Sequence, residues 1–325
     1  MSTGRIILTV FGGAVLFVGL ATLFAHLLRP FAPAKAAQAD QYAGADRPER
    51  DTPESREDLR RTLRDNMKVG GGPEPLVLDD GDAAQAAGAT TPPPDLPDGP
   101  VIAIVMTELG SNAANSRRAI ADLPAEITFT FTPYAAVSPA LAKAAKAEGH
   151  EVFVSLPMEP QRYPRINPGE NTLLRASDAS ENLERLDWAL TKFADLDGTT
   201  GMMGSAFTQD AVALRPVMKE LHMRGLTYID ARASGRSVAE RTARDSGVPS
   251  RSNDRFIDEP PTGANIGGNL SALIATAKRR GYAIGYARPL PATITALEAF
   301  GAEAEAAGVT LVGAARLARG LPDDV

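Results

Sequence analysis

Polar side chains that follow short apolar segments are the residues of this chain best suited to chemistry. Five of them stand out: Glu108, Glu159, Ser205, Asp230 and Arg232. Glu108 and Asp230 could form the carboxylate pair that glycoside hydrolysis needs, or could hold a hard cation such as Mg²⁺ or Ca²⁺. Arg232 offers a fixed fork of donors to a carboxylate or to sugar hydroxyl groups. These residue types point to hydrolysis or binding of ligands such as sugars.

Residue counts exclude several other chemistries. The 325 residues contain no cysteine, which excludes disulfides, thiolate zinc sites and cysteine nucleophiles. Of the three histidines, His26, His150 and His222, the last two are expected near the amino ends of strands, away from the polar residues. Ser205 lacks the G-x-S-x-G pattern of a nucleophile elbow. The net charge of −6 argues against a nucleic-acid partner.

The elements that must position these residues follow a recurring unit of helix, glycine and strand. An alanine-rich amphipathic helix ends at Gly149, Gly225, Gly281 or Gly308, and an apolar strand begins one or two residues later. Strands are predicted at 101–106, 127–131, 151–156, 199–203, 226–229, 282–286 and 309–312. Strands that alternate with helices form a parallel sheet, either open or closed into a barrel. Because parallel strands end at one edge, the five polar residues are expected to converge there.

The first 99 residues differ in composition from the rest. Residues 6–28 contain no Lys, Arg, Asp or Glu, and as a helix they would span about 35 Å, enough to cross a bilayer. We therefore expect a membrane anchor at 1–28, with a cleaved signal peptide as the alternative. Residues 29–99 hold 10 of the 25 prolines and are predicted to be a disordered linker. The folded α/β domain is expected at 100–320.

Short motifs in a fixed order resemble those of the divergent polysaccharide deacetylase family. They are IAIV at 102–105, LPMEP at 156–160, NTLL at 171–174, MGSAFT at 203–208, DARAS at 230–234 and PLPAT at 289–293. This resemblance covers residues 101–319. It implies a distorted (β/α) barrel outside the cytoplasmic membrane. It also implies an enzyme that removes acetyl groups from envelope glycans with a divalent metal, such as zinc, held by an Asp and two His.

The positions that match the family's metal and catalytic residues are substituted here. The family-equivalent pocket positions are Thr107, Glu108, Ser155, Met202, Asp230, Arg232 and Arg288. Thr107 and Glu108 replace an Asp-Asp pair, while Met202 and Arg288 stand at histidine positions. Without imidazole or thiolate ligands a zinc site is hard to build, so no metal and no other cofactor is expected. Arg288 is expected either to neutralise Glu108 or Asp230, or to point to solvent.

The expected function follows from these substitutions. We predict a single-pass protein of the cytoplasmic membrane whose main domain lies in the periplasm or outside the cell. The domain is expected to be non-catalytic and to bind an envelope glycan or an envelope protein through Glu159, Ser205, Asp230 and Arg232. The alternatives are an active deacetylase with an atypical, carboxylate-rich site and a purely structural envelope protein.

Overall fold

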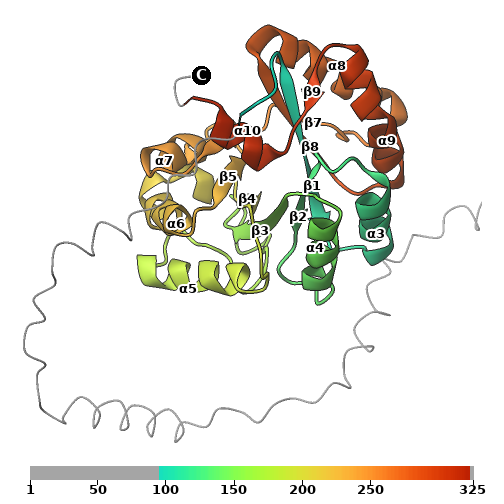
Figure 1. Ribbon diagram of the computed structural model, residues 1–325. Helices are drawn as coiled ribbons and strands as arrows, with labels where there is room; N and C mark the ends of the chain where they lie inside the picture. The colour runs from blue at the N-terminus through green and yellow to red at the C-terminus, as the bar shows by residue number, and fades with distance from the viewer. Residues whose placement is uncertain (1–94, 323–325) are drawn as a thin grey trace, which may run out of the picture. The chain divides into compact units, whose positions relative to one another are not determined.

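Nine parallel strands form one curled sheet in the computed structural model, which describes residues 95–322 (Figure 1). The strands are β1 Val101–Leu109, β2 Thr128–Phe131, β3 Val152–Met158, β4 Gly198–Met203, β5 Thr227–Asp230, β6 Ser250–Ser252, β7 Arg255–Phe256, β8 Tyr282–Ala287 and β9 Thr310–Leu311. Their order is β6-β5-β4-β3-β2-β1-β8-β7, and β9 pairs with the start of β1. The predicted parallel sheet is confirmed.

Helices follow most of the strands and cover the outer face of the sheet (Figure 1). They are α3 Ala113–Asp122, α4 Ser138–Ala147, α5 Ala179–Leu190, α6 Ala211–Met223, α7 Ala239–Asp245, α8 Gly263–Arg280, α9 Pro291–Ala306 and α10 Ala314–Gly320. Gly149, Gly225, Gly281 and Gly308 adopt φ values of 90°, 67°, 89° and 71°. The predicted glycine ends of the helices are therefore confirmed, because left-handed backbone strongly favours glycine.

The two edges of the sheet are joined by one segment, residues 250–256, here called the split strand. Its first half is β6, which pairs with β5, and its second half is β7, which pairs with β8. Between them, Asn253 donates to the carbonyl of Asp230 at 2.8 Å and Asp254 to that of Ile284 at 2.9 Å. β6 and β7 cannot pair with each other, because neighbouring parallel strands need a long crossover. The predicted barrel is thus a curled half-barrel bridged by this segment.

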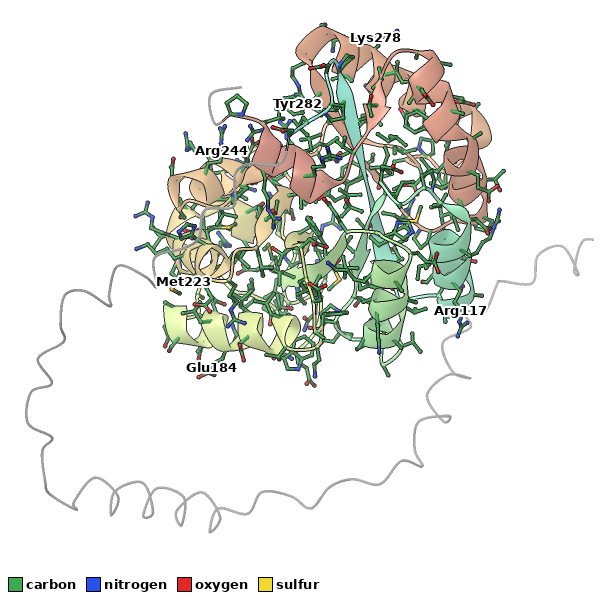
Figure 2. The ribbon with its side chains drawn as sticks, in the orientation of Figure 1. Arg117, Glu184, Met223, Arg244, Lys278 and Tyr282 are labelled. Atoms are coloured by element: carbon green, nitrogen blue, oxygen red, sulfur yellow. The ribbon has the colours of Figure 1, made fainter. Side chains whose placement is uncertain are left out.

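Apolar side chains fill both faces of the sheet. One cluster lies between the sheet and the outer helices, and a second lines the inside of the curl and packs on α10 at the amino ends of the strands. Charged residues such as Arg117 on α3 and Glu184 on α5 lie on the outer surface (Figure 2). Because the sheet is buried on both faces, its strands carry no simple alternation of apolar and polar residues.

The predicted anchor at 6–28 and the linker residues 29–94 lie outside the described residues. Within 95–322, no helix combines the length and the apolar character that a membrane span requires.

Candidate functional site

A cavity of about 300 Å³ opens at the carboxyl ends of the strands. Its walls include four of the predicted positions together with two aromatic rings: Thr107, Glu108, Ser155, Met202, Phe256 and Tyr286. A smaller cavity of about 120 Å³ adjoins it, sharing Thr107 and Glu108 and adding Arg288. We call the 300 Å³ cavity the central cavity. The sequence correctly predicted the end of the sheet at which it forms.

A bulge in β1 brings Thr107 and Glu108 to the cavity together. The register of β1 against β2 shifts between Met106 and Leu109, and both of these side chains belong to the outer core. The two residues between them can therefore both face inward, whereas a regular strand would send only one of them there. Glu108 adopts φ 64°, a left-handed backbone, and its side chain is exposed to solvent.

Hydroxyl groups form the polar floor of the cavity. The Ser155 hydroxyl lies 2.8 Å from that of Thr130, and Thr200 Oγ1 lies 2.8 Å from the Tyr286 hydroxyl while it donates to the Ile229 carbonyl at 2.7 Å. Burial raises the pKa of Tyr286 far above its ordinary value, so this ring stays neutral. The floor offers neutral hydrogen-bonding groups rather than a base.

Asp230 lies on the opposite face of the sheet from the central cavity. On β5, Ile229 belongs to the inner cluster and Tyr228 to the outer core, so Asp230 points outward as Tyr228 does. The Asp230 carboxylate is only 2% exposed and accepts hydrogen bonds from the Arg232 backbone N–H, at 2.9 Å, and from the Ser237 hydroxyl. Burial raises its pKa above the usual range, against the opposing effect of these hydrogen bonds. Asp230 therefore does not join Glu108 in one site.

Arg288 pairs with Asp258, so its predicted pairing with Glu108 or Asp230 is wrong. Arg288 Nε lies 3.5 Å from Asp258 Oδ1, and the Arg288 backbone N–H donates to Oδ2 at 2.8 Å. Asp258 is 2% exposed and follows β7. Sequence reasoning missed Phe256 and Asp258 because β7 has only two residues, too few to give an apolar strand signal. The acidic run after Phe256 was the one signal that could have drawn attention to this segment.

Glu159 and Ser205 hold the loop that follows β3 and do not line the central cavity. Glu159 Oε2 accepts the Arg175 backbone N–H at 2.8 Å, and Oε1 pairs with the Arg175 guanidinium at 3.1 Å. Ser205 Oγ accepts the backbone N–H of Gln161 at 3.1 Å. Glu159 therefore joins two parts of this loop, and Ser205 joins the loop to the turn that follows β4. Their predicted role in binding remains a prediction.

The donor groups around the cavity do not fit the divalent metal that the resemblance implies. Residues 95–322 contain no cluster of three His, Asp or Glu side chains able to hold a metal ion. The cavity presents Glu108, hydroxyl groups and the thioether of Met202, a poor ligand for a hard ion. His150, before the start of β3, donates from Nδ1 to the Ile127 carbonyl at 2.9 Å and packs on Phe129, so it lies at the other end of the strands from the cavity.

The curled parallel half-barrel, with its cavity at the carboxyl ends of the strands, is consistent with a fold of the deacetylase type. The profile of the divergent polysaccharide deacetylase family matches residues 104–318, and the chain belongs to this family.

Similar proteins cover the same part of the chain. An uncharacterized protein of Haemophilus influenzae is 30% identical over 198 residues, which are 61% of this chain and 70% of that protein. The uncharacterized protein YibQ of Escherichia coli is 29% identical over 198 residues, which are 61% of each chain. The crystal structure of the uncharacterized protein ATU2773 from Agrobacterium tumefaciens C58 aligns with a TM-score of 0.65 at 34% identity, over 67% of this chain and 89% of that one.

Proposed function

We propose that this chain is a non-catalytic member of its family that binds an envelope glycan in the central cavity. The proposal rests on the contacts that two of the substituted positions make within the protein. Ser155 is bonded to Thr130, and Arg288 is paired with Asp258, so both are engaged within the protein itself. Both side chains thus have polar partners within the protein, and neither needs the ion that the family's chemistry requires.

The lining of the cavity suits a sugar. Sugar rings present apolar faces and peripheral hydroxyl groups, and sites that bind small molecules combine aromatic walls with a few polar groups. Phe256 and Tyr286 supply the aromatic surface, while Thr107 and Glu108 supply hydrogen-bonding groups.

Hydrolysis by paired carboxylates is not supported by the geometry. Asp230 lies on the outer face of the sheet, and Asp258 forms an ion pair with Arg288. Glu108 is the one carboxylate that lines the 300 Å³ cavity. Glu259 lines the adjoining cavity and a recess beyond Phe256 but not this cavity, so no second carboxylate faces Glu108 inside it to complete the acid and base pair that such a reaction needs.

The location is part of the proposal. The charge-free segment 6–28 supports a single membrane anchor, with the domain in the periplasm or outside the cell. Fractionation of a C-terminally tagged chain tests it, and recovery of a soluble protein with a new N-terminus near residue 37 would establish a cleaved signal peptide instead.

Calorimetry of the full chain with chitotetraose tests the binding function. Saturable binding is expected, together with weaker binding by Phe256→Ala and no release of acetate with or without added zinc. The helix residue Arg117, exposed on α3, provides the control Arg117→Gln, which should bind like wild type. Acetate release that Glu108→Gln abolishes would establish the active deacetylase instead, and absence of binding would overturn the proposal.

A further inference from the structure

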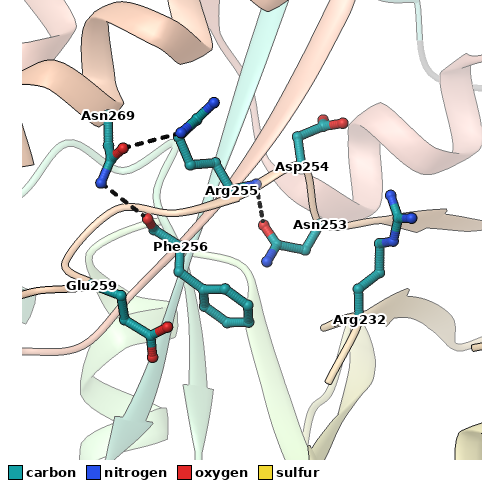
Figure 3. A pocket seen from close by; sticks show the side chains of 7 residues that line it. All are labelled: Arg232, Asn253, Asp254, Arg255, Phe256, Glu259 and Asn269. Atoms are coloured by element: carbon teal, nitrogen blue, oxygen red, sulfur yellow. Dashed lines mark hydrogen bonds between the residues drawn. The ribbon is translucent and has the colours of Figure 1, made fainter. Parts of the chain in front are cut away.

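An open polar recess of about 400 Å³ lies beside the central cavity (Figure 3). Its walls come from the end of β5, the second half of the split strand and α8. The residues that matter for its chemistry are Arg232, Asn253, Arg255, Phe256, Glu259 and Asn269.

Phe256 joins the recess to the central cavity. This side chain lines the recess, the central cavity and the smaller cavity beside Arg288. Its ring lies 6.1 Å from that of Tyr286 at an angle of 70°, and 36% of the residue is exposed. An aromatic ring that is supported on one side and open on the other suits the apolar face of a sugar. The three cavities therefore meet at this side chain.

The recess carries a small positive charge. Arg232 and Arg255 contribute two guanidinium groups. Asp254 is paired with Arg280 at 2.6 Å, which leaves Glu259 as the carboxylate that offsets one of them. Figure 3 shows the Glu259 carboxylate directed away from both guanidinium groups. The balance is about one positive charge, and Figure 3 shows the two guanidinium groups on either side of Asp254.

The two arginines are held in place without using all their donors. Arg255 Nη1 donates to Asn269 Oδ1 at 3.2 Å, which fixes its direction. Arg232 adopts φ 52°, and its backbone N–H donates to Asp230 Oδ1 at 2.9 Å. No side chain among residues 95–322 accepts a hydrogen bond from the Arg232 guanidinium. A left-handed backbone at a non-glycine residue is uncommon, and such residues gather at functional sites.

We propose that this recess is a second subsite, which binds a sugar unit carrying one carboxylate, so that the ligand is an acidic polysaccharide. This inference rests on the proposed function, because the central cavity must hold a neighbouring unit of the same chain. Arg232 binds the carboxylate, Arg255 adds positive charge on the other side of Asp254, and Phe256 stacks on the ring between the two subsites. A net charge of about +1 suits a single carboxylate better than a doubly charged phosphate.

Two tetrasaccharides of equal length test the subsite on the full chain. Chitotetraose is neutral, whereas a hyaluronan tetrasaccharide alternates N-acetylglucosamine with a sugar that carries a carboxylate. Calorimetry is expected to show about tenfold tighter binding of the hyaluronan fragment at low salt. Arg232→Gln should abolish that preference, so that this variant binds the two fragments with equal affinity. Arg117→Gln should leave both affinities unchanged, and excess inorganic phosphate at matched ionic strength should not displace the acidic fragment.

Each outcome decides between the two proposals. Equal affinities for the two fragments, or a preference that survives Arg232→Gln, would overturn the acidic subsite and leave the glycan site intact. Failure of both fragments to bind would overturn the glycan site and the subsite with it. Displacement by phosphate would contradict the carboxylate as the recognised group.

Discussion

The two ends of the curled sheet hold a carboxylate in opposite ways. At the amino ends of the strands, Glu151 accepts the backbone N–H groups of Ala315 and Arg316 at 2.7 and 2.9 Å and caps the start of α10. It also accepts the Thr128 hydroxyl at 2.9 Å. At the carboxyl ends, Glu108 is exposed on the wall of a cavity. One end uses its carboxylate for stability, and the other leaves it open to a ligand.

The backbone shows the same difference. The non-glycine residues with positive φ in the described chain are Glu108, Met203 and Arg232, at 64°, 63° and 52°. They lie at the ends of β1, β4 and β5, around the open end of the sheet. Each such conformation costs on the order of 1 kcal/mol, so stability is given up where ligands would bind.

The largest effect on stability is expected at the amino ends of the strands, where Glu151 lies. Glu151→Ala should lower the free energy of unfolding by about 3 kcal/mol, because three hydrogen bonds to a half-buried carboxylate are lost. Glu108→Ala should lower it by less than about 1 kcal/mol, since this side chain is exposed. Urea unfolding measures both. Equal losses would show that the two ends do not differ in this way.

Two substitutions in the central cavity, at the carboxyl ends of the strands, should create a metal site. The double variant Ser155→His, Met202→His places two imidazoles beside Glu108 in one cavity. Zinc at a concentration one hundred times its Kd should raise the free energy of unfolding of this variant by about 2.7 kcal/mol. The melting temperature should rise accordingly. Wild type and a triple variant that adds Glu108→Ala should show no comparable shift. Zinc stabilisation of the wild type would contradict the fit of donors described above.

Stability should depend on pH through Asp230. Burial raises the pKa of this carboxyl in the folded state above its ordinary value of 3.8. The folded chain therefore keeps the proton to higher pH than the unfolded chain, and stability falls as pH rises from about 3.8 through the raised pKa.

Asp230→Asn should remove this loss. The stability of the variant relative to wild type should increase over that window and then level off. Urea unfolding from acidic to neutral pH measures it, with the exposed residue Glu184 replaced by Gln as a control. A constant difference between wild type and Asp230→Asn would remove the case for a protonated, buried carboxyl.

The smallest effect concerns backbone strain. Met203 is 45% exposed and left-handed, so Met203→Gly should stabilise the fold by about 0.5 kcal/mol. Met223, 72% exposed at the end of α6, is a control in helical backbone, and Met223→Gly should destabilise by up to about 1 kcal/mol (Figure 2). Destabilisation by both substitutions would show that Met203 is not strained.

Local features of the fold were predictable because their causes are local. The glycines after the helices at Gly149, Gly225, Gly281 and Gly308 mark helix ends, and apolar runs mark the buried strands. The end of the sheet that carries Thr107 and Glu108 followed from the rule for parallel strands. The split strand was not predictable, because its halves of three and two residues are too short to give a pattern.

The sequence by itself determined the order of helices and strands, the family motifs and the loss of the imidazole positions. It could not determine the face on which Asp230 lies, because a strand buried on both faces has no polar alternation to indicate it. Only the tertiary structure decided that Arg288 pairs with Asp258, 30 residues earlier. It also decided that Phe256 lines both the central cavity and the recess beside it. Strand register and the bulge in β1 set these placements, and both arise from contacts between distant segments.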